Sequence, residues 1–134
     1  MQVLDWFRRA DVEALCCTHT GLPYAQDFQH SAGRYLVANN GCAGLPGFAG
    51  RHHGVLTRLS VFSDVPGDSL YGLATAGLRF DALPVEYDHR HWVTDFLDTW
   101  PPGSPARRNY YHRIEDGTWL TPEHAARGTV TCFA

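Results

Sequence analysis

The sequence contains no lysine, and all 11 of its basic residues are arginine. We attribute this bias to the codon composition of the source genome rather than to function. The formal net charge is −3, whereas a protein that tracks nucleic-acid phosphates carries a basic face. The stretch "ARRNYY" (106–111) mixes arginine with tyrosine, as stacking platforms for single strands do. A packed aromatic face with solvated arginine stems is the simpler interpretation, so nucleic acid is not expected as the main partner.

Cysteine pairs with metal-binding spacing are also lacking. The four cysteines are Cys16, Cys17, Cys42 and Cys132, and none forms a C-x-x-C pair. Cys16 and Cys17 would point to opposite faces of a strand. We expect reduced, buried thiols in a cytoplasmic protein rather than disulfides.

Long uncharged apolar runs are missing as well. A charge comes as early as Asp5, so we expect neither a secretory signal nor a membrane-spanning segment, and no membrane partner. The motifs G-x-G-x-x-G, G-x-S-x-G and H-E-x-x-H and the P-loop do not occur either, which leaves nucleotide-binding and common hydrolase signatures unmatched.

What the chain does have is enough apolar sequence for a core. Of its 134 residues, 44% are hydrophobic and 13% aromatic, which predicts one folded domain over 1–134. Apolar and alternating stretches predict a sheet over 13–87, preceded by a short helix near 2–11. The expected strands lie at 12–17, 34–40, 53–62, 70–77 and 78–88. The clean alternation of 53–62 favours an antiparallel sheet, and Pro84 predicts an edge position or a strand end.

The last third of the chain changes character and predicts a helical tail over 88–128. Asp88 is a natural N-cap for a helix over 88–100, and Ser104 caps a second helix that ends near Gly117. Thr121 begins a third helix, with Gly128 past its end. The expected fold class is therefore α+β, with an antiparallel or mixed sheet and flanking C-terminal helices.

Two polar loops follow expected strands, "THTGLP" (18–23) and "NNGCAGLPGFAG" (39–50). Such loops commonly carry metal and phosphate sites. His19 offers a neutral imidazole nitrogen to a metal, Asn39 and Asn40 offer amide groups, and glycine N–H groups can face an anion. For His19 alone, an ordinary hydrogen-bonded turn is the competing interpretation.

Four more histidines leave their roles open. His52 and His53 are adjacent, so at most one of them can face a given site if they lie on a strand. His89 and His91 would share a face in an extended segment and could bind metal there. They also follow a helix cap, where solvated polar side chains are ordinary.

The two loops together resemble the C-terminal part of the calcineurin-like metallophosphoesterases. In that family a Gly-His-x-His turn ends one strand, and a second strand leads into an Asn-x-Gly-Ser type of loop. "THTG" (18–21) lies over the turn, and residues 37–46 lie over the second element. The region "ALPVEYD…WPPGSPA" is similar to the tail of a bacterial subset of the family.

The resemblance implies half of a β-sandwich flanked by helices, and a phosphodiesterase-type hydrolase. Its divalent metals (Mn, Fe, Zn or Ni) would polarise the phosphoryl group and generate a hydroxide. It implies that His19 is a metal ligand, while Gly21 stands where the family has its second histidine. The residues implied to shape the phosphate side are Thr18, Thr20, Asn39, Asn40 and Gly41.

The family's Asp-x-His, Gly-Asp and Gly-Asn-His motifs of the first half are not found in the required order. The resemblance thus implies a C-terminal portion that is incomplete or inactive as this chain alone. The alternative is a non-catalytic module that buries an exposed sheet face against another copy or another protein. A third hypothesis is a self-contained metal enzyme built from His19, His52 or His53, and Cys42. The phosphoester substrate is left open between nucleotide, phosphodiester, phosphoprotein and phospholipid.

Overall fold

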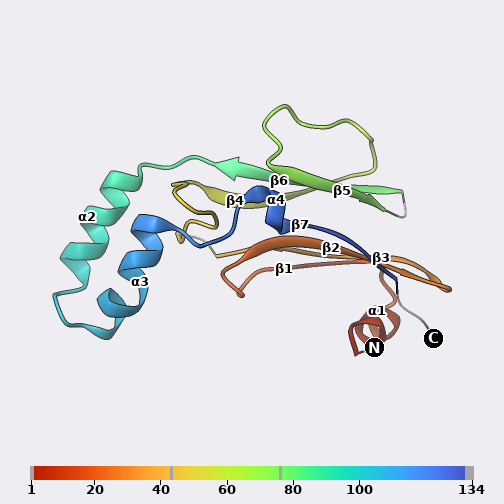
Figure 1. Cartoon of the computed structure of the whole chain (residues 1–134), viewed down its shortest axis with the longest axis horizontal. Helices are drawn as coiled ribbons and strands as arrows, with labels where there is room; N and C mark the ends of the chain where they lie inside the picture. The colour runs from red at the N-terminus through yellow and green to blue at the C-terminus, as the bar shows by residue number, and fades with distance from the viewer. Residues whose placement is uncertain (1, 43, 76, 132–134) are drawn as a thin grey trace.

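Two β-sheets pack face to face in the computed structural model, which describes residues 2–42, 44–75 and 77–131 (Figure 1). The strands are β1 (Ala14–Cys17), β2 (Pro23–His30), β3 (Gly33–Asn40), β4 (Gly54–Ser60), β5 (Tyr71–Thr75), β6 (Leu78–Val85) and β7 (Ala126–Thr131). The helices are α1 (Gln2–Ala10), α2 (His89–Thr99), α3 (Pro105–Asp116) and α4 (Pro122–Ala125). The expected α+β class is confirmed.

The first sheet is mixed and has the strand order β1-β3-β2-β7. β2 and β3 form an antiparallel hairpin, while β1 runs parallel to β3 and β7 runs parallel to β2. The register places Cys17 opposite Asn39 at the end of the β1–β3 pair. The carboxyl ends of these two strands therefore lie at the same edge of the sheet.

The second sheet is antiparallel with the order β4-β6-β5, as the alternation over 53–62 predicted. Pro84 lies next to the last residue of β6, so the predicted strand end is confirmed, whereas β6 is the central strand of its sheet and not an edge. Pro84 pairs with Val55 of β4 but lies beyond Ala82, the last residue of β6 that pairs with β5. The missing N–H of proline is tolerated there because no β5 partner faces it.

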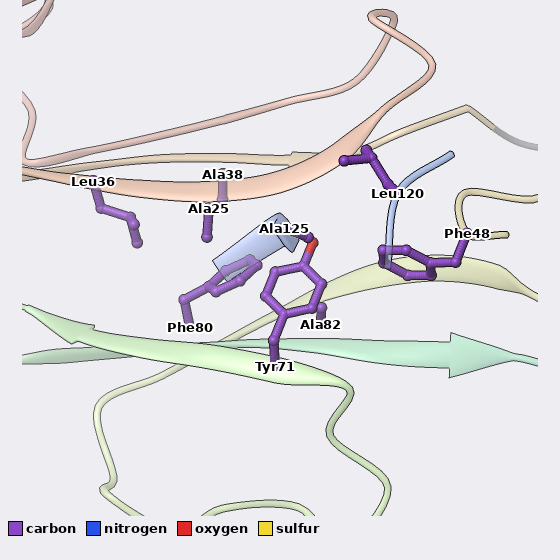
Figure 2. Close-up of a cluster of buried hydrophobic side chains, with 9 residues drawn as sticks. All are labelled: Ala25, Leu36, Ala38, Phe48, Tyr71, Phe80, Ala82, Leu120 and Ala125. Atoms are coloured by element: carbon purple, nitrogen blue, oxygen red, sulfur yellow. The ribbon is translucent and has the colours of Figure 1, made fainter. Parts of the chain in front are cut away.

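The core fills the space between the sheets with small residues from one side and aromatic residues from the other. Ala25 and Ala38 of the first sheet are fully buried, and Phe80 and Tyr71 of the second sheet project toward them (Figure 2). The complete buried cluster is Ala25, Leu36, Ala38, Phe48, Tyr71, Phe80, Ala82, Leu120 and Ala125. Each large side chain buried in this way stabilises the fold by about 1.5–3 kcal/mol before entropy is counted.

β2 was not expected, because Pro23 and several polar residues obscure its alternation. Asp27 lies at a buried position of this strand, where an apolar residue would be typical. Its carboxylate accepts from Arg34 at 2.7 Å and from the Thr129 hydroxyl of β7 at 3.1 Å. These partners offset the cost of burying the charge, so a polar sequence can form an interior strand.

The third helix, expected to run from its cap at Thr121 to just before Gly128, is present but ends earlier. α4 ends at Ala125, and the Thr121 side chain makes no capping hydrogen bond. From Ala126 the chain extends as β7 and pairs with Ala25 and its neighbours in β2. Pairing with an open sheet edge overrides the local helix signal, so the helical tail ends before 128.

The two helices predicted after Asp88 and Ser104 are present as α2 and α3, and they pair at one end of the sandwich (Figure 1). The Asp88 carboxylate accepts from the His91 backbone N–H at 2.9 Å, and the Ser104 hydroxyl accepts from the Arg107 N–H at 3.3 Å. α1 lies near the opposite end and buries Leu4 and Phe7. No helix in the described ranges has both the length and the apolar character needed to cross a bilayer.

Candidate functional site

The two polar loops singled out in the sequence meet in space. β1 leads into the 18–22 turn and β3 leads into the loop that begins at Gly41, and the parallel pairing of the two strands places both at one sheet edge. Ligand sites in sheets with parallel strands form at the carboxyl ends of those strands. The structure therefore assembles the candidate site from two separate segments.

Hydrogen bonds join the two loops directly. The Thr18 hydroxyl donates to the Gly41 carbonyl at 2.6 Å, and the His19 backbone N–H donates to the same carbonyl at 3.2 Å. Asn39 is fully buried, and its amide nitrogen donates to the Thr18 carbonyl at 3.4 Å. Its amide oxygen accepts from the Gly41 N–H at 2.8 Å. Asn39 thus clamps the turn and the loop to each other.

Asn40 and Thr20 serve the same loops by other contacts. The Asn40 amide donates to the Val55 carbonyl of β4 at 3.2 Å and so ties the first sheet to the second. The Thr20 hydroxyl accepts from the Leu22 N–H at 3.4 Å within its own turn. The polar groups expected to shape a phosphate side therefore hold the backbone of the site in place, and direct contact with a substrate stays a prediction.

His19 is exposed at the tip of this arrangement. Its backbone φ is 95°, in the left-handed region that a non-glycine residue adopts only when its surroundings hold it there. The two bonds that converge on the Gly41 carbonyl supply that constraint. The strained turn presents the imidazole to solvent instead of packing it into the core.

Gly21, which the resemblance aligned with a second histidine, also has a positive φ of 73°. Its carbonyl accepts from the guanidinium of Arg113 in α3, and a Cβ at this position would lie 3.6 Å from Arg113 Nη2. A histidine here would face both backbone strain and the arginine. The local geometry therefore favours glycine at position 21.

The remaining candidate histidines support the fold elsewhere. The rings of His52 and His89 stack with centroids 3.8 Å apart, and their Nε2 atoms donate to the Glu115 and Ile114 carbonyls, each at 2.8 Å. His53 is buried beside Phe48. His52 and His89 are distant in the sequence, and both bind the C-terminal end of α3. Nothing in the sequence indicated that they would meet there.

His91 lies on the exposed side of α2, and its Nε2 is 3.5 Å from an Asp95 carboxylate oxygen. Within residues 2–42, 44–75 and 77–131, no three His, Cys, Asp or Glu side chains are grouped so that they could hold a metal ion. The self-contained site from His19, His52 or His53, and Cys42 is therefore not formed. Stable binding of a divalent ion takes several converging ligands, so the described residues do not fit a metal pair on their own.

The cysteines differ from expectation in exposure. Cys16 and Cys17 are free thiols but exposed rather than buried, and Cys132 lies outside the described residues. Partial burial raises the pKa of the Cys16 thiol, and the neighbouring Cys17 raises it further. The raised pKa keeps the Cys16 thiol protonated at neutral pH, which makes it less reactive.

The geometry thus supplies an exposed imidazole on a strained turn, beside a glycine-rich loop fixed by a buried asparagine. Both elements lie at the carboxyl ends of parallel strands, which is a position suited to ligand binding. In comparisons with known proteins, no protein-family model matches the chain, and neither a curated protein nor a solved structure matches it.

Proposed function

We propose that this chain is the C-terminal part of a cytoplasmic, metal-dependent phosphoester hydrolase of the calcineurin-like metallophosphoesterase type. The supporting observation is that the two motifs behind the resemblance are joined by hydrogen bonds at one sheet edge. In this proposal His19 supplies one ligand to a divalent metal site. The other ligands come from polypeptide outside this chain, since the described residues offer no group of three.

Each neighbour of His19 has a role in the proposal that its contacts support. Thr18 and Asn39 fix the distance between the turn and the loop, and Gly41 receives both bonds from the turn. Asn40 anchors the loop to β4. A ligand held on such a constrained backbone needs little reorganisation when it binds, which favours precise positioning.

The test joins this chain to a segment that carries the family's Asp-x-His, Gly-Asp and Gly-Asn-His motifs. Cleavage of bis-p-nitrophenyl phosphate is then measured with Mn²⁺. Loss of a side chain that only hydrogen-bonds to a metal ligand typically lowers activity by about 10–100-fold. His19→Ala removes the proposed ligand itself, so it should lower activity by at least that much. The matched control is His112→Ala, an exposed histidine on α3. A folded, complete chain without activity, or equal effects of the two variants, would refute the proposal.

A second candidate, a non-catalytic oligomerisation module, is favoured by the outer face of the first sheet. This face carries an open apolar groove of about 530 Å³ bordered by α1, with Trp6 53% exposed and Leu15, Phe28 and Val37 along the strands. Exposed contiguous apolar surface commonly marks an interface, here with a second copy. Sedimentation velocity over a wide concentration range tests it, and a monomer throughout would argue against this candidate.

A further inference from the structure

A second hollow lies where β3 and β6 end and β4 begins, next to the first turns of α2. Its volume is about 510 Å³, within the range of small-ligand pockets. Its lining includes Asn40, Val55, Tyr87, Trp92 and Asp95. The proposed hydrolase function does not use this cavity.

The aromatic wall of the cavity is fixed in place before any ligand arrives. The Trp92 indole N–H donates to the Gly44 carbonyl at 2.9 Å. A Cβ at Gly44 would stand 3.4 Å from Trp92 Cζ2, and the φ of Gly44 is +76°, so glycine permits this close approach. A ring held in this way offers a rigid face to a ligand, with little entropy to lose on binding.

Tyr87 contributes a second ring and an unused polar atom. Its hydroxyl is buried and has no hydrogen-bond partner in the described part of the chain. Burial raises the pKa of Tyr87, and the nearby Glu86 raises it further, so the phenol keeps its proton at neutral pH. A buried hydroxyl of this kind gains from a ligand that brings a hydrogen-bonding group.

The ionisable side chains of the lining, apart from Tyr87 and Cys42, are two carboxylates and one imidazole, that of His91. Asp88 and Asp95 line the cavity, and no arginine does among the described residues. Asp88 is partly engaged as the cap of α2, and the Asp95 carboxylate has the His91 imidazole nearby, with Nε2 at 3.5 Å. Two carboxylates beside aromatic faces disfavour anions and attract cations.

We propose that this cavity binds a small organic ammonium ion, with the cationic group against Trp92 and Tyr87 and close to the Asp95 carboxylate. Aromatic rings combined with negative charge are the surroundings in which quaternary ammonium groups are recognised. This site goes beyond the hydrolase proposal and does not depend on it, because its test measures binding alone.

The test compares three ligands of one shape and different charge: choline, 3,3-dimethylbutan-1-ol and 3,3-dimethylbutanoate. The readout is the indole N–H signal of Trp92 in the ¹⁵N-labelled chain, assigned from the spectrum of Trp92→Phe. Choline should shift this signal saturably, the neutral alcohol should bind at least about fivefold more weakly, and the carboxylate should give no shift. No saturable shift with choline, or equal affinity for all three ligands, would overturn the proposal.

Asp95→Asn and Asp98→Asn form a matched pair, because they make the same change on the same helix and only Asp95 lines the cavity. Asp95→Asn should weaken choline binding by about threefold or more, while Asp98→Asn should leave it within about twofold. Equal losses in the two variants would refute the role given to Asp95. The three-ligand series on the unchanged chain does not depend on the folding of either variant.

Discussion

Asp81 shows how a single charged residue can be held inside the second sheet. Its side chain is fully buried on the central strand β6, and its carboxylate accepts from Arg79 at 2.6 Å and from Arg58 at 3.1 Å. The Ser69 hydroxyl donates to it at 3.1 Å. Arg58 also pairs with the exposed Asp64 at 2.9 Å, so the network ties the 61–70 loop to the sheet.

We expect Asp81→Ala to lower the free energy of unfolding by about 3–5 kcal/mol, because two largely buried guanidinium groups lose their common partner. Asp64→Ala removes only an exposed partner of the same network and should cost less than about 1 kcal/mol. Urea unfolding curves at neutral pH measure both variants. Similar losses for the two would show that the buried carboxylate is not the centre of the network.

Tyr71 predicts a dependence of stability on pH. Its ring projects from β5 into the core (Figure 2), its hydroxyl is buried without a partner in the described chain, and burial raises the pKa of Tyr71 well above its usual value. Below about pH 10 the phenol is neutral in both folded and unfolded states. Above that pH the unfolded state releases the proton first, so stability should fall as pH rises.

Tyr71→Phe should remove most of this alkaline decline, and at pH 7 it should leave stability unchanged or raise it by about 1 kcal/mol. The measurement is the urea midpoint between pH 8 and pH 11, with Tyr110→Phe as the control because that ring is 49% exposed. A steep alkaline decline that persists in Tyr71→Phe would contradict the assignment.

At the scale of single elements, the two C-terminal helices differ in how they begin. The Ser104 hydroxyl caps α3, while Thr121 before α4 makes no capping bond. We expect Ser104→Ala to cost about 1 kcal/mol and Thr121→Ala clearly less. Thermal unfolding followed by circular dichroism gives both values, and the reverse order would rule out the capping role of Ser104.

The elements that the sequence predicted correctly are those whose signals are local. Asp88 and Ser104 mark the starts of α2 and α3, and alternation marks β4 to β6. β2 was missed because Pro23 and its polar residues obscure its alternation, whereas β7 was missed because its strand character depends on pairing with the distant β2, including the Asp27–Thr129 contact. No local pattern reports such pairing.

The same division applies to the candidate site. Both loops could be identified from their composition, but that they meet follows from the parallel pairing of β1 with β3. The strained backbone of His19 and the clamp made by Asn39 depend on that pairing, so they were not predictable from residue types. The cavity beside Trp92 also had no sequence signal, because it is bounded by three separate segments.

On the scale of the whole molecule, one of the contacts that join the helical pair to the sandwich lies where the 48–50 loop meets the end of α3 and the residues after it. The Ala49 N–H donates to the Leu120 carbonyl at 2.8 Å, and the Gly50 N–H donates to the Asp116 carbonyl at 3.0 Å. Between them lies Gly117, with a φ of 74°, where a Cβ would stand 2.1 Å from the Phe48 carbonyl oxygen. Glycine is therefore required at position 117 for two reasons: the positive φ, and the close approach of the Phe48 carbonyl.

Gly117→Ala should destabilise the protein by about 3 kcal/mol or more, since this contact must open to admit a methyl group. Gly103 has a similar φ of 83° but open space around it, so Gly103→Ala isolates the conformational cost of about 1–2 kcal/mol. Differential scanning calorimetry distinguishes them by their melting temperatures. Equal decreases in melting temperature for the two variants would show that the close contact between Gly117 and Phe48 adds nothing to the loss of stability.

The pairing of β7 with β2 also has a consequence for the order in which the protein can be assembled. Asp27 and Thr129, which meet across these strands, are 102 positions apart, so a ribosome must release nearly all of this sequence before the first sheet gains its last strand. Until then the β2 edge is open to strands of other chains. Long-range closure of this kind is intrinsically slow, and newly made molecules should depend on chaperones more than a helical bundle of equal length would.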